Sequence, residues 1–148
     1  MNDGISFEEY LNKNGSLTYS NVGTSMLPML RQGRDIFTVR KKGEERCKRG
    51  DVVLYRRPPD QYVLHRIIKV RPEDYVILGD NCIAKEYGIR DESIIGVLTG
   101  FVRDGKEYSV TDPGYRVYSA LWLNTMPIRI AVKKCILKAK RLVRGKRS

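Results

Sequence analysis

A serine in a predicted turn and the single histidine of the chain are the two residues whose types and spacing could do chemistry together. Ser25 follows an extended polar and apolar segment and precedes Pro28, which places its hydroxyl in an exposed loop. His65 lies forty positions later, in the alternating run of residues 62–70 that is typical of a strand. A serine hydroxyl is a weak nucleophile that needs an adjacent base, and the ordinary pKa of histidine, about 6.5, suits that task. The pair therefore predicts nucleophilic catalysis, with Ser25 as nucleophile and His65 as general base.

Four short motifs in a fixed order favour this interpretation over a structural serine in a turn and a structural histidine on a strand. They are Gly23-x-Ser25-Met26-x-Pro28, a Gly-Asp step before an apolar strand (Gly33 with Asp35, and Gly50 with Asp51), His65-Arg66-Ile67, and Gly79-Asp80-Asn81. Over residues 20–100 this series resembles the signal peptidase type I superfamily of serine peptidases. Most bacterial members carry lysine at the position of His65. The archaeal and endoplasmic-reticulum members carry histidine, so the chain resembles the histidine variant.

The resemblance implies further site residues. Asp80 would hold the imidazole of His65 in its tautomer and stabilise the imidazolium, as the third member of a triad. Asp80 could instead only cap the Gly-Asp-Asn turn, and Asp91 is the alternative orienting carboxylate. Met26 would line the substrate groove, although most methionines fill cores. Substrates of the family bind as an added strand at a sheet edge, and the resemblance implies no cofactor and no metal.

Charge is distributed unevenly along the 148 residues. All 17 acidic residues lie at or before Asp112, whereas residues 116–148 hold ten Lys and Arg and no acid. This last segment therefore carries nearly all of the net charge of +11. We expect two parts, a catalytic domain of residues 1–114 that is almost neutral and a basic C-terminal tail of residues 115–148.

Cysteine usage and hydropathy bear on the compartment. Cys47, Cys82 and Cys135 are odd in number and lack C-x-x-C spacing, which argues against a disulfide framework and against zinc. Residues 1–10 contain no apolar segment of the kind that a signal peptide needs. The most apolar stretch, residues 117–132, is interrupted by polar residues and falls short of the roughly 18 apolar residues of a membrane span. We expect a cytoplasmic protein with reduced thiols.

The elements that must position Ser25 and His65 are mostly short strands. Turn residues separate runs rich in β-branched and aromatic residues, at 16–22, 35–40, 51–56, 62–70, 75–78, 94–103 and 107–111. Asp104-Gly105 between the last two runs predicts a tight hairpin. Ser6 with Glu9 predicts a capping box that opens a short helix, which Gly15 ends. The pattern predicts a mainly β, compact coiled fold of signal peptidase type with a short N-terminal helix.

The tail adds a basic amphipathic C-terminal helix, which we predict to begin at Pro127, in its first turn. Apolar residues then recur with a period of 3.6, at 128, 131, 132, 135, 136, 139, 142 and 143, and Lys or Arg occupy the other faces. Upstream, Tyr115, Tyr118 and Trp122 favour a membrane–water boundary. Three interpretations stay open: a helix in the plane of an anionic membrane, an apolar face packed on the β-domain, and nucleic-acid binding, which no recognition motif supports.

Together these observations predict a serine endopeptidase that cuts an extended peptide segment, signal- or leader-like, with Ser25, His65 and Asp80 as its centre. A self-cleaving regulator of the repressor type is one alternative. It is disfavoured because no helix-turn-helix domain precedes the core and because that branch uses lysine as base. A non-catalytic peptide-binding or membrane-adaptor module is the other alternative. The expected partners are a peptide or protein substrate and an anionic membrane surface that holds the protein peripherally, and nucleic acid is not expected.

Overall fold

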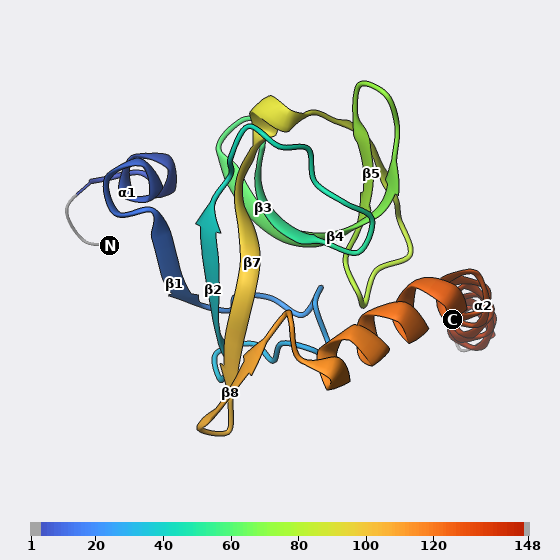
Figure 1. The fold of residues 1–148 in the computed structure, drawn as a ribbon. Coiled ribbons are helices and arrows are strands. Elements are labelled where there is room, and N and C mark those ends of the chain that lie inside the picture. Colours follow the sequence, from blue (N-terminus) through green and yellow to red (C-terminus); the bar gives the residue numbers. More distant parts are fainter. Residues whose placement is uncertain (1–3, 147–148) are drawn as a thin grey trace.

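A computed structural model describes residues 4–146, and all of its strands except one overlap the β-rich runs predicted from the sequence. In chain order the elements are α1 (Phe7–Asn14), β1 (Ser16–Ser20), β2 (Ile36–Lys41), β3 (Val52–Arg57), β4 (Gln61–Val70), β5 (Tyr75–Leu78), β6 (Glu86–Ile89), the single-turn helix η1 (Asp91–Ser93), β7 (Ile94–Arg103), β8 (Lys106–Ser109) and α2 (Pro113–Gly145). The predicted class is confirmed: a compact, mainly β fold with one helix near each end (Figure 1).

The eight strands form one antiparallel sheet with the order β1-β2-β7-β3-β4-β5-β6, and β8 pairs with β7. Register shifts interrupt four of the pairings, between Thr38 and Val39, between Leu54 and Tyr55, between Ile67 and Lys69, and between Tyr75 and Ile77. Such bulges bend a strand and increase its twist. The sheet consequently curls, so that β3, β4 and β5 surround one end of the molecule (Figure 1).

The curled sheet takes part in three buried clusters, and β3 contributes to two of them because successive side chains of a strand point to opposite faces. Leu54 of β3 belongs to a cluster that also contains Met26 and Leu30 of the loop after β1. Val53, its neighbour on β3, belongs to a second cluster with Ile67. Met26 is 1% exposed, so it fills the core rather than lining a groove.

Two local predictions from the sequence are confirmed. Ser6 and Glu9 form the reciprocal capping box of α1, and Gly15 ends the helix in the left-handed conformation. Asp104 and Gly105 both have positive φ and join β7 to β8 in a tight hairpin.

Strand β6 was not predicted from the sequence. It spans four residues, Glu86–Ile89, and includes Gly88 at a positive φ, so neither alternation nor β-propensity marks it. It forms only because β5 offers an edge, with Ile77 opposite Glu86 and Tyr75 opposite Ile89. This pairing fixes the position of Glu86.

The predicted start of the C-terminal helix is wrong. The helix α2 begins at Pro113, which takes the first-turn position assigned to Pro127, and Pro127 lies inside it. Pro127 removes one backbone donor from the helix. Nearby side chains donate to carbonyls of the preceding turn, the Thr125 hydroxyl to Leu121 and the Arg129 guanidinium to Trp122, and the helix continues.

Candidate active site

The loop between β1 and β2 holds Ser25 against the sheet. Its ends are joined by backbone hydrogen bonds from Asn21 N–H to the Asp35 carbonyl and from Gly33 N–H to the Asn21 carbonyl. The buried Asp35 carboxylate accepts from the Arg31 backbone at 2.7 Å and from its guanidinium at 2.8 Å. These hydrogen bonds lower the pKa of Asp35, so the ion pair persists over a wide pH range. With Met26 in the core, this loop holds Ser25 on a fixed backbone.

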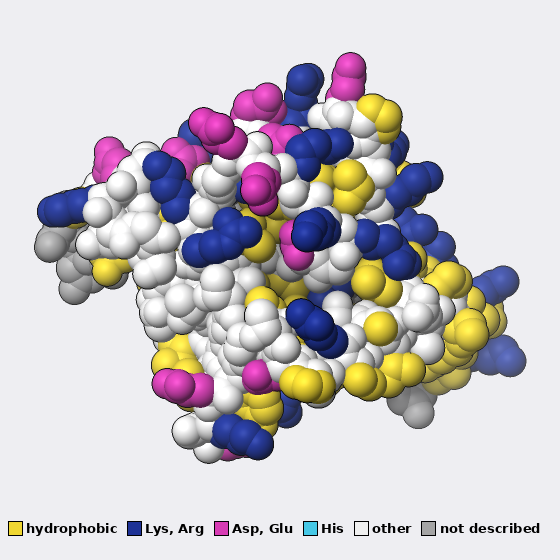
Figure 2. All heavy atoms as spheres, in the orientation of Figure 1, with side chains coloured by type: hydrophobic (Ala, Val, Ile, Leu, Met, Phe, Trp, Pro, Cys, Tyr) yellow, Lys and Arg dark blue, Asp and Glu magenta, His cyan; other side chains and the backbone are white. Residues whose placement is uncertain are grey.

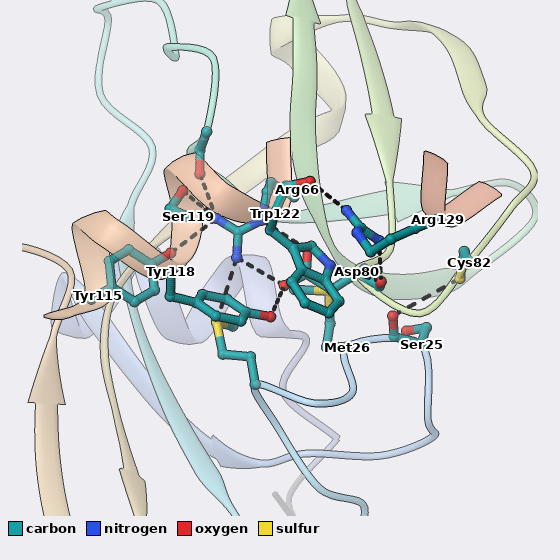
Figure 3. A network of polar contacts seen from close by, with 12 residues as sticks. Ser25, Met26, Arg66, Asp80, Cys82, Tyr115, Tyr118, Ser119, Trp122 and Arg129 are labelled. Carbon is teal, nitrogen blue, oxygen red and sulfur yellow. Dashed lines mark hydrogen bonds and ion pairs between the residues drawn. The ribbon is translucent and has the colours of Figure 1, made fainter. Parts of the chain in front are cut away.

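The turn Gly79-Asp80-Asn81 lies directly against the Ser25 loop. The Asn81 N–H donates to the Ser25 carbonyl at 2.8 Å, and the Asn81 side chain donates to the Thr24 carbonyl at 3.1 Å. The Cys82 thiol lies 3.9 Å from the same Ser25 carbonyl (Figure 3). Two motifs that are far apart in the sequence thus form one unit.

Gly79 shows how closely His65 approaches this unit. A Cβ atom at Gly79 would lie 2.7 Å from the Ser25 carbonyl oxygen and 2.9 Å from His65 Nε2. Both distances are shorter than a side chain tolerates, so only glycine allows this packing. His65 Nε2 and the Ser25 backbone therefore flank the same small volume. Within residues 4–146 the Ser25 hydroxyl forms no hydrogen bond to His65, and such bonds in free enzymes often form only with substrate bound.

The other ring nitrogen of His65 faces Tyr55 and Glu86. His65 Nδ1 lies 3.3 Å from the Tyr55 hydroxyl and 3.8 Å from Glu86 Oε1. The Tyr55 hydroxyl donates to Glu86 at 2.7 Å, and Glu86 also pairs with Arg57. When Nδ1 carries the proton and donates to Tyr55, Nε2 is left as the acceptor on the Ser25 side. Burial lowers the pKa of His65, with Glu86 opposing the shift, so the imidazole is neutral at pH 7.

Asp80 contacts Arg66 instead of His65. Its carboxylate accepts from Arg66 Nε at 2.8 Å, from the terminal Arg66 nitrogen at 2.9 Å and from the Tyr118 hydroxyl at 2.8 Å (Figure 3). Neighbouring side chains of β4 point to opposite faces, so the Arg66 partner of Asp80 lies on the face away from His65. No hydrogen bond or ion pair joins Asp80 to His65 in the described part of the chain. In this structure Asp80 therefore does not orient the imidazole of His65, contrary to the prediction from the sequence.

Asp91, the alternative orienting carboxylate, lies in a different cluster. It accepts from the Tyr75 hydroxyl at 2.6 Å and lies 3.5 Å from both Lys42 Nζ and Arg46 Nε.

Sequence reasoning missed Tyr55 and Glu86, the two groups that do face His65. Val53 is the residue opposite His65 in the β3–β4 pairing, so Tyr55, two positions along, shares its face. Predicting the register between β3 and β4 would have placed Tyr55 next to His65. The position of Glu86 could not be predicted in this way, because it depends on strand β6, which the sequence does not indicate.

Ser25 and His65 line the same open cavity, whose volume is about 880 Å³. Its walls come from the Ser25 loop, from residues 61–65 of β4, from residues 81–86 and from α2. A second cavity of about 800 Å³ lies between α1 and η1, but it contains neither Ser25 nor His65. In residues 4–146 no group of three or more His, Cys, Asp or Glu side chains is arranged to hold a metal ion.

The first half of α2 is joined to the site by polar contacts. Arg66 donates to the Ser119 hydroxyl at 2.9 Å and to the Tyr115 hydroxyl at 3.3 Å, and Trp122 Nε1 donates to the Asp80 carbonyl at 2.9 Å. The aromatic residues at 115, 118 and 122 therefore pack on the sheet instead of marking a membrane boundary. Among residues 4–146 no helix combines the length and the apolarity that crossing a membrane requires.

Comparisons with protein families, with curated proteins and with solved structures find no match to this chain. The resemblance to signal peptidases thus stays a prediction from the sequence motifs, and the functional argument depends on the geometry of the site.

Proposed function

We propose that the chain is a serine endopeptidase with Ser25 as nucleophile and His65 as general base. The observation that carries this proposal is the approach of His65 Nε2 and the Ser25 backbone across Gly79, within one open cavity. A neutral imidazole close to a serine is the arrangement that activates a hydroxyl, and here Ser25 is half-buried and His65 is buried.

The proposed reaction proceeds in two steps. His65 Nε2 takes the proton of the Ser25 hydroxyl as its oxygen attacks the scissile carbonyl, and the imidazolium then gives that proton to the leaving amine. This breaks the C–N bond and leaves an ester on Ser25. Water, deprotonated by His65, attacks the ester, and its cleavage returns the proton to Ser25. Tyr55 and Glu86 are proposed as positioning residues, which hold Nδ1 and favour the imidazolium electrostatically.

The shape of the cavity favours an extended substrate. Strand β4 pairs with β3 through residues 61–66, but its pairing with β5 begins only at Arg66. Residues 61–65 therefore present one open edge, and these residues line the cavity beside His65. A peptide could add to this edge as a further strand through main-chain hydrogen bonds, with its scissile bond next to Ser25.

An active-site-directed fluorophosphonate probe tests the proposal. We expect labelling of the full chain at Ser25, mapped by mass spectrometry, and loss of labelling in Ser25→Ala and in His65→Ala. Ser93→Ala, which alters a serine in the second cavity, is the matched control and should label normally. A folded protein that stays unlabelled would favour the non-catalytic peptide-binding module. Self-cleavage of the purified chain would favour the regulator.

We also propose that α2 attaches the enzyme to an anionic membrane surface through its outward face. Six large apolar side chains that share one side of this helix are exposed: Val117, Leu121, Ile128, Val132, Leu142 and Val143. Figure 2 shows hydrophobic side chains following α2 along the lower edge of the molecule, with Lys and Arg beside them. The helix contains no acidic residue, so a second copy would repel this face whereas anionic lipid complements it.

A further inference from the structure

The inner side of the last turns of α2 faces the candidate catalytic cavity. Lys133, Ile136, Leu137 and Lys140 all line this cavity. Their spacing of three, four and seven residues places them on one stripe of a helix. This stripe adjoins the outward apolar face, because Ile136 lies one turn after Val132 of that face. The stripe and the open edge of β4 line the same cavity.

The apolar members of the stripe are only about half covered by the described part of the chain. Ile136 is 49% exposed and Leu137 is 44% exposed, although both border a cavity. Covering such side chains on binding is favourable because it removes apolar surface from water. The wall therefore provides an apolar surface that a bound peptide would cover.

Basic side chains outnumber acidic ones among the residues that line the cavity. Among the described residues that line it, Glu86 is the one acidic side chain, and Glu86 pairs with Arg57. Lys133 donates to the carbonyl and to the side-chain oxygen of Asn81. Lys140, by contrast, forms no hydrogen bond or ion pair with any residue from 4 to 146. An unpaired cation beside an apolar surface is complementary to a carboxylate on the ligand.

We infer that this stripe is a substrate-recognition wall, and that it selects extended peptides with an acidic side chain against Lys140 beside an apolar side chain against Ile136 and Leu137. The inference rests on the proposed function, because the selected ligand is the peptide that Ser25 would cut. It adds a substrate class, acidic-apolar peptides, that the nucleophile and base do not define.

The test uses capture, which does not depend on catalysis. Full-length Ser25→Ala is immobilised, incubated with a randomised peptide library, and the retained peptides are sequenced. Ser25→Ala with Lys140→Glu is compared with Ser25→Ala with Lys138→Glu, a control that makes the same charge change outside the cavity lining. Both lysines are exposed on the helix, and Glu has a helix propensity close to that of Lys.

We expect Ser25→Ala to enrich peptides with Asp or Glu near an apolar residue by about five-fold, as suits one partly exposed ion pair. Lys140→Glu should abolish this enrichment or reverse it toward Lys and Arg, and Lys138→Glu should preserve it. Equal losses in both variants would show a general attraction to a basic helix and would overturn the inference, as would no acidic enrichment at all. Acidic capture without cleavage by the unmutated chain would leave the wall intact and overturn only the proposed protease activity.

Discussion

His65 is buried, and burial affects the pKa of its imidazole. Burial is the main cause that lowers its pKa below the ordinary value of 6.5, and the nearby Glu86 acts in the opposite direction. A base must be deprotonated to act, so activity is lost as the pH falls through the pKa of His65. The neutral imidazole thus lets the proposed centre operate at neutral pH.

The pH dependence of kcat/KM on a cleaved peptide tests both the base and its neighbour. We expect an acid limb below pH 6.5 in the unmutated chain. Glu86→Gln removes an anion that favours the imidazolium, so the limb should move to still lower pH. Glu73→Gln, on an exposed turn, should leave it unchanged. An acid limb above about 8 that survives His65→Ala would transfer the role of base to a lysine.

Ser25 and His65 should act as one catalytic unit. We expect Ser25→Ala and His65→Ala each to lower kcat by about 10⁴-fold or more, and the double substitution to lower it little further. Both variants should retain the far-ultraviolet circular dichroism and thermal midpoint of a folded chain. Losses that multiply in the double variant, or near-normal turnover in His65→Ala, would contradict a shared mechanism.

At the scale of elements, the Arg66–Asp80 pair connects strand β4 to helix α2. Both side chains are 1% exposed, and Tyr115, Tyr118 and Ser119 complete the hydrogen bonding from the helix. Asp80 also contacts the loop that contains Ser25, since its N–H donates to Met26 Sδ at 3.5 Å. The beginning of α2 therefore belongs to the same folded unit as the sheet, and residue 114 does not separate two independent parts.

Removing one partner of this buried pair should be costly. We expect Asp80→Asn to lower the free energy of unfolding by about 3–5 kcal/mol, because it leaves the Arg66 guanidinium buried without its counter-charge. Asp91→Asn, at a more exposed ion pair, should cost about 1 kcal/mol or less. Urea denaturation measures both. The apolar pair Arg66→Met with Asp80→Leu should destabilise less than Asp80→Asn alone. Equal stability of all three would contradict a structural role for the pair.

At the scale of the whole molecule, α2 has two sides with different partners. Its inner side packs on the sheet and borders the cavity, while its outer side presents uncovered apolar residues between cationic ones. A helix of this kind on an anionic surface would bring the cavity to the membrane without crossing it.

Co-sedimentation with vesicles tests this arrangement. We expect the full chain to bind anionic vesicles at low salt. It should bind much less to neutral vesicles, and much less to anionic vesicles when the salt concentration is high. The reason is that each Lys or Arg near the surface contributes about 1 kcal/mol before screening. Ile128→Glu with Leu142→Glu, both at exposed positions of the outer side, should abolish binding. Tyr87→Glu with Val70→Glu, exposed apolar residues outside α2, should not. If the unmutated chain forms dimers and Ile128→Glu with Leu142→Glu abolishes them, the outer side of α2 mediates self-association instead.

The identity of the candidate pair and most strands could be predicted from the sequence because both depend on local chemistry. The chain has one histidine, and runs of alternating or β-branched residues form strands wherever one face is buried. The Ser6–Glu9 cap and the Asp104-Gly105 turn likewise depend on neighbours within a few residues. The signal for Ser25 was equally local, a serine in a turn beside Pro28.

The partners of the charged residues were decided only by the tertiary structure. Asp80 follows β5 at the point where Arg66 of β4 faces it, so strand register determined its partner. Glu86 lies near His65 because β6, a strand with low β-propensity, pairs with the edge of β5. The outward apolar face of α2 stayed uncovered because the helix docks through Tyr115, Tyr118 and Trp122 instead. These outcomes depend on contacts between segments far apart in the chain, whose geometry no local pattern encodes.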